Sequence, residues 1–298
     1  MKRILTLCAL LAAVFTGCVP STAQDEPFRI LTSFHPIYAL VSTVSANIDG
    51  VSVDVLAGPQ TGCLHDYQLS TADLRKLETA DVLVINGAGM EPFLDKVLAQ
   101  YPDLPIIDSS KGVPLLGATS NNENFNPHIW MSLTNAMTQV DNIVGGLSAV
   151  DSAHGALYAQ AGVQTIKSLR KEWRKCSDLL AAYKGRDIVI FHESLAYLAD
   201  EFGLNVLSTI QTEENTQPTA AALSDTIALI KKANKDVPLF TEEQYTASAA
   251  EAIAAETGAK IYELNTMVYA GDSPETDFLD AVKQNRATLA AALKSEDA

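Results

Sequence analysis

The chain has 298 residues, of which 47% are apolar, and a formal net charge of −15. This length exceeds one ordinary hydrophobic core and predicts two domains of about 100–150 residues each. The acidic balance argues against a nucleic-acid-binding protein, because neutralising phosphates requires a basic face. It suits a soluble protein that attracts cations, although an acidic surface is more often simply a solvated one.

The N-terminus predicts export. Lys2 and Arg3 precede an apolar run over residues 4–15. The run is too short to span a bilayer as a mature helix and is typical of a signal peptide, which we place at residues 1–17.

The end of this signal resembles a bacterial lipobox. Residues 15–18 read Phe-Thr-Gly-Cys, with small residues before a cysteine that is acylated and becomes the new N-terminus. Cys18 is therefore the expected lipid anchor, and residues 18–28 are a short tether. Ordinary cleavage after residues 21–23, without a lipid, is the alternative.

An N-terminal lobe is predicted over residues 29–150, where strand-like apolar runs alternate with helix-like stretches. Such alternation predicts βαβ units and a mainly parallel sheet. The expected strands are residues 29–34, 51–56, 81–86 and 104–107, and the expected helices are residues 36–47, 70–79 and 91–100.

A long linking helix is predicted over residues 151–184, which contain no proline and two glycines. If continuous, about 34 residues at 1.5 Å each would span near 50 Å. Two helices broken near Gly162 are the alternative. His154 is expected on the surface of this helix.

The C-terminal lobe is predicted over residues 185–298 and repeats the architecture of the first. Its expected strands are residues 187–191, 205–210, 237–241 and 259–264, and its expected helices are residues 194–202, 219–234, 247–256 and 274–293. The fold class is therefore α/β, with two lobes of mainly parallel sheets joined by one long helix.

Three of the five histidines lie in loops at or beyond the expected strands, where parallel α/β folds bind ligands. His65 follows the strand at 51–56, His128 precedes a helix, and His192 follows the strand at 187–191. Imidazole is the commonest protein ligand for zinc, and three imidazoles form most of a tetrahedral shell. Taken singly, each histidine is more often a satisfied surface or capping residue.

A carboxylate is the expected fourth ligand. Asp272 follows the last expected strand of the second lobe. His65 and His128 would then come from the first lobe, and His192 and Asp272 from the second. A metal ion held by all four would lie between the lobes.

Several segments resemble, in order, the metal-binding segments of the zinc and manganese lipoproteins of ABC importers. They are residues 65–70, His-Asp-Tyr-Gln-Leu-Ser; residues 126–130, Asn-Pro-His-Ile-Trp; residues 191–198; and residues 271–273. The resemblance extends from about residue 30 to the C-terminus. It implies two Rossmann-like lobes, a connecting helix, and delivery of one metal ion to a membrane permease.

The sequence also departs from this family. Residues 68–69 replace the usual Glu-Pro, and residues 111–126 lack the histidines that many zinc-specific members carry there. Cys63 lies two residues before His65, where a thiolate could bind a soft metal, although a plain thiol is the simpler interpretation. His35 occupies a place usually held by tyrosine and is expected to support the site rather than to bind metal.

Three nitrogens and a carboxylate oxygen favour Zn²⁺ in tetrahedral geometry. Mn²⁺ and Fe²⁺ remain alternatives, because mixed-specificity members of the resembling family share this ligand set, although manganese prefers more oxygen. Glu193, beside His192, either orients an imidazole or is a solvated carboxylate.

The rival classes are a zinc hydrolase and a surface adhesion protein. A hydrolase needs an open position for water, which Asp272 would fill, and the sequence has neither HExxH nor GxSxG. We therefore expect no enzyme. We expect instead an exported, lipid-anchored and monomeric binding protein that faces the periplasm or cell exterior, with an ABC permease as its partner.

Overall fold

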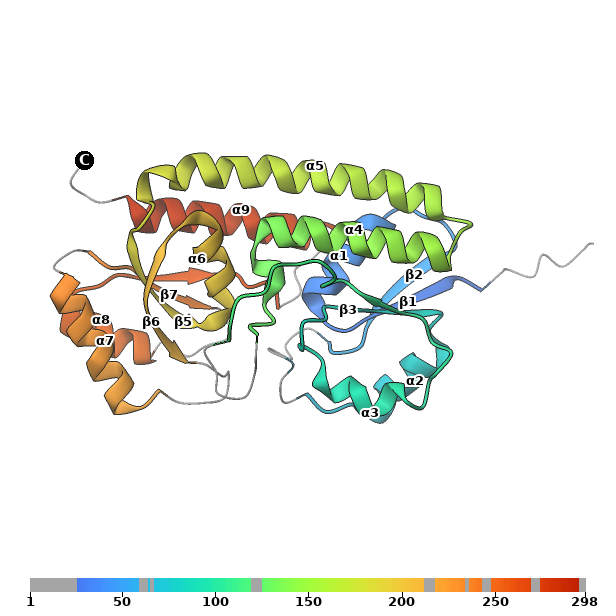
Figure 1. The fold of residues 1–298 in the computed structure, drawn as a ribbon, viewed down its shortest axis with the longest axis horizontal. Helices are drawn as coiled ribbons and strands as arrows, with labels where there is room; N and C mark the ends of the chain where they lie inside the picture. Colours follow the sequence, from blue (N-terminus) through green and yellow to red (C-terminus); the bar gives the residue numbers. More distant parts are fainter. Residues whose placement is uncertain are drawn as a thin grey trace, which may run out of the picture.

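The computed structural model describes residues 26–58, 64, 67–118, 125–211, 218–233, 236–242, 248–268 and 274–294. Within these residues the strands form two parallel sheets, one in each lobe of an elongated molecule (Figure 1). The strands of the first lobe are β1 (Phe28–Thr32), β2 (Val51–Val55), β3 (Val82–Ile85) and β4 (Ile106–Asp108). Those of the second lobe are β5 (Asp187–His192), β6 (Asn205–Gln211), β7 (Leu239–Glu242) and β8 (Ile261–Leu264).

The burial of the strands follows their place in the sheets. The inner strand β3 is apolar on both faces, as covered parallel strands are. The edge strand β2 alternates valines with Ser52 and Asp54, and only its valines are partly buried. The two sheets have the same strand order, β2-β1-β3-β4 and β6-β5-β7-β8. Each sheet therefore has a topological switch point, between β1 and β3 and between β5 and β7.

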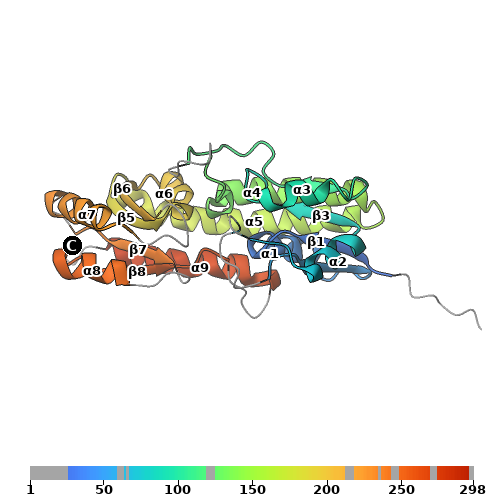
Figure 2. The same cartoon turned by 90° about the horizontal axis from the view of Figure 1, so that it is seen from below.

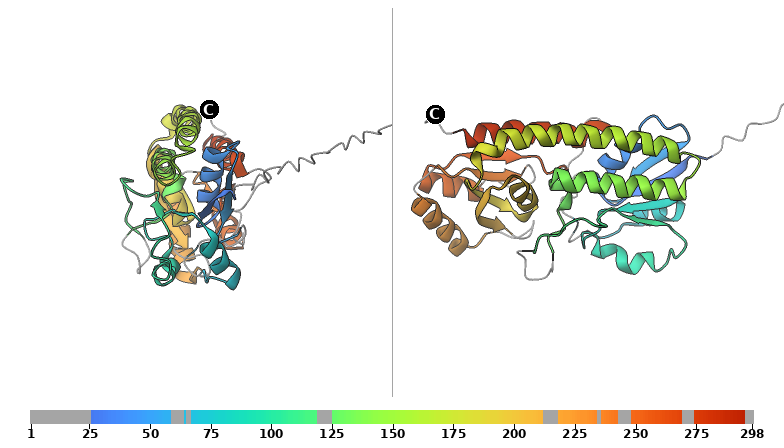
Figure 3. Two further views of the ribbon diagram at one scale, coloured as in Figure 1. Left: turned by 90° about the vertical axis from the view of Figure 1, so that its right-hand side faces the viewer. Right: turned by 45° about the horizontal axis from the view of Figure 1, so that its top comes forward.

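Helices cover the sheets and join the lobes. They are α1 (His35–Ser45), α2 (Thr71–Thr79), α3 (Asp95–Leu98), α4 (Leu133–Val150), α5 (Gly155–Leu180), α6 (Ala196–Phe202), α7 (Ala220–Ala233), α8 (Ser248–Thr257) and α9 (Pro274–Leu293). Helix α5 runs along the long axis over both lobes, with α4 beside it (Figure 3). Helix α9 extends back from the second lobe to pack against α1 of the first (Figure 2).

One hydrophobic core continues through both lobes. It includes Ile30 and Val84 from the first sheet, Ile190 and Phe240 from the second, and Leu169 from α5. The lobes therefore share buried apolar surface in addition to the linking helix.

The predicted α/β fold with two parallel-sheet lobes is confirmed, and most strand and helix bounds agree within two residues. The helix expected at 91–100 is instead a 3₁₀ turn, Pro92–Leu94, followed by the short α3. No helix among the described ranges is long and apolar enough to cross a membrane.

The linking helix is shorter than expected. It begins at Gly155 rather than near residue 151, and its 26 residues span about 39 Å. His154 lies just before the helix, where its Nδ1 is 2.7 Å from Asp151 Oδ2. The helix continues through Gly162, where an added Cβ would lie 2.6 Å from Val144 Cγ2. Gly162 therefore allows close packing against α4 and does not break the helix.

Two adjacent glycines of α4 give a matched test of this packing. A Cβ at Gly146 would lie within 2.8 Å of three atoms of Ile107, whereas a Cβ at Gly145 meets nothing within 4 Å. Gly146→Ala should lower the free energy of unfolding by about 1–3 kcal/mol through overpacking. Gly145→Ala should raise it by up to about 1 kcal/mol through helix propensity. Urea unfolding of both variants measures the difference, and equal effects would contradict the packing of α4 on β4.

Candidate metal-binding site

The second sheet places two polar side chains at its switch point. His192 is the last residue of β5 and Glu242 is the last residue of β7, and the two strands pair side by side. Both side chains are buried, and His192 Nδ1 lies 3.3 Å from Glu242 Oε1. The Ser194 hydroxyl donates to the same carboxylate oxygen. A carboxylate beside Nδ1 favours a proton on that nitrogen, which puts the imidazole lone pair on Nε2.

The first lobe contributes His128, in the loop between β4 and α4. Its side chain is fully buried. Asn126 Oδ1 accepts a hydrogen bond from the His128 backbone N–H at 3.0 Å and lies 2.8 Å from His128 Nδ1. An amide oxygen only accepts, so the proton is on Nδ1 and the lone pair is again on Nε2.

His128 and His192 meet at the junction of the lobes. Their ring centroids are 4.8 Å apart, and the planes cross at 86°. Two imidazoles that are 64 residues apart in sequence are thus neighbours, one from each lobe. Each has its Nδ1 beside an oxygen acceptor, the usual arrangement for a histidine that binds metal through Nε2.

The other two predicted ligands, His65 and Asp272, lie outside the described residues, as do Cys18 and Cys63. Their participation stays a prediction. Within the described part of the chain, no group of three or more His, Cys, Asp or Glu side chains is placed to hold a metal ion. Cys176 is described and is a buried free thiol.

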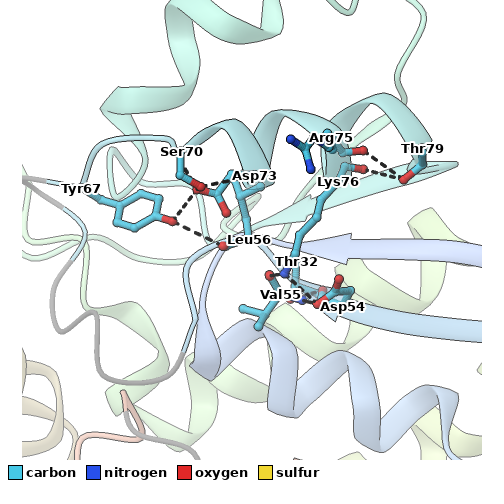
Figure 4. A network of polar contacts seen from close by, with 10 residues as sticks. All are labelled: Thr32, Asp54, Val55, Leu56, Tyr67, Ser70, Asp73, Arg75, Lys76 and Thr79. Atoms are coloured by element: carbon cyan, nitrogen blue, oxygen red, sulfur yellow. Dashed lines mark hydrogen bonds and ion pairs between the residues drawn. The ribbon is translucent and has the colours of Figure 1, made fainter.

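The described residues from Tyr67 onward are fixed by polar contacts (Figure 4). The Tyr67 hydroxyl donates to Asp73 Oδ2 at 2.9 Å and lies 3.4 Å from the Leu56 carbonyl oxygen, just after β2. Ser70 and Asp73 form a capping box at the start of α2. Burial, together with the Asp73 carboxylate, raises the pKa of Tyr67 to about 12, so the phenol stays a neutral donor. These contacts attach the chain beside His65 to the first lobe.

His35 occupies a different place, at the start of α1. It is buried, and its Nε2 lies 3.4 Å from Asp277 Oδ2 of α9. Burial lowers the pKa of His35, and the attraction to Asp277 opposes this shift. The side chain therefore links α1 and α9, and its relation to the metal site stays a prediction.

Polar contacts also join the His128 loop to the second lobe. Asn126 Nδ2 donates to the Glu193 carbonyl at 2.7 Å, and the Tyr197 hydroxyl donates to the Asn126 carbonyl at 2.7 Å. Trp130 Nε1 donates to the Thr266 carbonyl at 2.9 Å. Glu193 is itself buried, so the interpretation of a solvated carboxylate is wrong.

The sequence prediction did not include Glu242 or Asn126 among the functional residues. Glu242 directly follows the expected strand at 237–241, so the rule that selected His192 would have selected it as well. Asn126 lies two residues before His128, in the segment 126–130, but no local signal indicates its contact with Glu193 across the lobes.

The family described as "Zinc-uptake complex component A periplasmic" matches residues 30–292. The chain is 26% identical to the zinc-binding lipoprotein AdcA of Streptococcus pneumoniae over 90% of its own length, but spans only 56% of that relative. It is 25% identical to the high-affinity zinc uptake system protein ZnuA of Bacillus subtilis, covering 95% of the chain and 93% of the relative.

Among solved structures, the chain is similar to the solute-binding protein FpvC of Pseudomonas aeruginosa in complex with Ni²⁺. The TM-score is 0.80 at 27% sequence identity, over 92% of this chain and 99% of the other. FpvC is also known in complex with Mn²⁺. The similarity therefore extends over both lobes and the helices that join them.

Glu201 of α6 offers a test of the connection between the lobes. Its carboxylate accepts hydrogen bonds at 2.8 Å from the backbone N–H groups of Leu133 and Thr134 at the start of α4. Glu201→Ala should lower the free energy of unfolding by about 1–3 kcal/mol, because it leaves helix N–H groups without an acceptor. The exposed neighbour Asp200→Ala should change it by less than about 0.5 kcal/mol. Equal effects in denaturant unfolding would contradict this role of Glu201.

Proposed function

The chain belongs to the family of periplasmic zinc-uptake component A proteins, and from this premise we propose that it captures one divalent transition-metal ion between its lobes and delivers it to an ABC permease. The observation that carries the proposal is the buried pair of His128 and His192, one from each lobe. A metal ion bound by both would contact the two lobes at once.

The complete ligand set of this proposal is His65, His128, His192 and Asp272. Support comes from the surroundings of the two described histidines, whose Nδ1 atoms lie beside oxygens of Asn126 and Glu242, an arrangement that favours a proton on Nδ1. Both Nε2 atoms then carry lone pairs suited to a metal. Support for His65 comes from the fixed position of Tyr67, two residues later.

Zinc is the proposed cargo. Three imidazoles and one carboxylate suit its tetrahedral geometry, whereas manganese prefers more oxygen ligands. The relatives AdcA and ZnuA are named for zinc, but FpvC is known with Ni²⁺ and Mn²⁺. Mn²⁺ and Fe²⁺ are therefore the alternatives, and elemental analysis of protein purified without added metal distinguishes them.

The proposed role is binding and not catalysis. A fourth protein ligand would close the zinc shell and leave no position for activated water. Turnover of a generic ester or peptide by the zinc-loaded chain would instead favour the hydrolase alternative. Adhesion, the other alternative, predicts a partner whose binding does not depend on metal.

We also propose that the protein is exported and held at the membrane through a lipid on Cys18, as a monomer facing the periplasm or cell exterior. The support is the sequence before Cys18 and the family description, which names the periplasm. Such an anchor would keep the loaded protein close to its permease.

His128→Ala tests the site directly. Zinc should raise the melting temperature of the wild-type protein, because a ligand at 100 times its Kd stabilises the fold by about 2.7 kcal/mol. We expect the zinc affinity of the variant to fall at least about 10–100-fold. Loss of a residue that only orients a ligand typically has an effect of this size, and His128→Ala removes the ligand itself. Thermal melting with chelator and with added zinc measures both proteins.

His154→Ala is the control for this experiment, because His154 lies just before α5 and pairs with Asp151 rather than with the histidine pair. It should respond to zinc as the wild type does. Wild-type zinc affinity in His128→Ala would remove His128 from the site.

Cys18→Ser tests the lipid anchor. Because the replacement removes the acylated thiol, we expect the protein to move from the membrane fraction to the soluble exported fraction. Cys8→Ser, within the predicted signal, should leave the protein in the membrane fraction. Fractionation and immunoblotting give the answer, and membrane retention of Cys18→Ser would exclude this anchor.

A further inference from the structure

The turn after β3 contains three consecutive residues with left-handed backbone conformations. Gly87, Ala88 and Gly89 have φ angles of 78°, 54° and 87°. Alanine rarely adopts this region, and a Cβ at Gly87 would collide with the Asp108 carboxylate. Such a turn persists only where surrounding contacts hold it, and it lies at the switch point of the first sheet.

Glu91 holds this turn with its buried side chain. One carboxylate oxygen accepts the Asn86 backbone N–H at 2.7 Å, and the other accepts the Gly87 backbone N–H at 3.1 Å. Two successive N–H groups that point to one place form an anion-binding concavity. A carboxylate can satisfy both donors, whereas an amide has only one acceptor oxygen.

Asn86 connects the turn to the loop that carries His128. Its Nδ2 donates to the Pro127 carbonyl at 3.0 Å and to the Gly87 carbonyl at 2.8 Å. Its Oδ1 accepts from Gln139 Nε2 of α4 at 3.0 Å. All the polar groups of the Asn86 side chain are thus engaged, and its orientation is fixed.

We infer that Glu91 is a positioning residue of the metal site, because through Asn86 it holds the Pro127 carbonyl, and with it the backbone of His128, against the end of β3. The inference rests on the proposed function, since it takes His128 to be a ligand. The contacts run from Glu91 to Asn86, from Asn86 to Pro127, and then along the chain to His128.

The environment of Glu91 gives this role a signature that can be measured. Burial raises the pKa of Glu91 from its ordinary value of 4.5 to about 7, and Asp108 acts in the same direction. Hydrogen bonds from the Ser33 side chain and from the Asn86 and Gly87 backbone oppose this shift. The folded state therefore binds the proton more tightly than the unfolded chain. The stability that this proton contributes is present below about pH 4.5 and is lost as the pH rises through about 7.

Glu91→Gln tests the inference. The zinc Kd of the full chain, measured by competition with a chromophoric chelator, should rise 10–100-fold, as is typical when a residue that orients a ligand is changed. In the metal-free protein, the imidazole ¹⁵N shifts of His128 should also move. In the wild-type protein, the contribution of Glu91 to the free energy of unfolding should decline between about pH 4.5 and 7, and this decline should be absent from Glu91→Gln.

Glu172→Gln is the matched control. Glu172 is 4% exposed and Glu91 is 6% exposed, but Glu172 is in α5 and pairs with Lys175 and Arg286. Its replacement should lower the melting temperature and leave the zinc Kd and the His128 shifts unchanged. Should Glu91→Gln not fold, Gln139→Leu removes the contact to Asn86 Oδ1 and should weaken zinc binding in the same direction.

Unchanged zinc affinity and unchanged His128 shifts in a folded Glu91→Gln or Gln139→Leu variant would overturn the inference. Equal weakening in Glu172→Gln would do the same, because the effect would then be a general loss of stability. Failure of the wild-type protein to bind zinc, manganese or iron is a separate outcome that counts against the proposed function itself.

Discussion

The amide of Asn126 is the interaction on which the candidate site depends. Its oxygen lies beside His128 Nδ1 and its nitrogen donates to the Glu193 carbonyl, next to His192. One side chain thus sets the tautomer of a histidine from the first lobe and attaches it to the strand end that carries the histidine of the second. Because an amide oxygen accepts and an amide nitrogen donates, the two contacts fix each other's direction. The close approach of the two imidazoles follows from this geometry.

Burial makes the arrangement specific. Buried polar groups destabilise the fold unless they are hydrogen-bonded, and buried charged groups destabilise it unless they are paired. Asn86 satisfies this requirement with Glu91, Pro127 and Gln139, and His192 lies beside the buried Glu242 carboxylate. In the second lobe, the carboxylate beside His192 comes from the end of the inner strand β7. In the first lobe, Asn126 of the loop before α4 contacts His128 directly, and Asn86 at the end of β3 binds the adjoining Pro127 carbonyl. The two switch points thus supply the supporting contacts as well as a ligand candidate.

The sequence revealed the parts of this structure that depend on local pattern. Apolar runs such as that of β3 identify buried strands. The position of His192 at the end of the apolar run of β5 can likewise be recognised from the sequence. The start of α5 was misplaced because residues 151–154 lack proline, and helical spacing alone does not show where a turn separates two packed helices. Glu242 and Glu91 were missed for a different reason. Glu242 does follow an expected strand, but its contact with His192 depends on the pairing of β7 with β5. The role of Glu91 depends on how the turn after β3 folds back onto its carboxylate.

The way the lobes are joined limits how a metal ion can enter. A wide separation would break the Trp130–Thr266 and Tyr197–Asn126 hydrogen bonds and would expose a core that is continuous through both lobes. Each of these hydrogen bonds contributes about 0.5–1.5 kcal/mol net to stability, and exposure of the shared apolar core adds to the cost of separating the lobes. His128 lies between Asn126 and Trp130 in the chain, so the contacts of these two residues with the second lobe hold it beside His192. Metal exchange is therefore expected to proceed by small local movements around a preformed pair of imidazoles, rather than by opening of the lobes as rigid bodies.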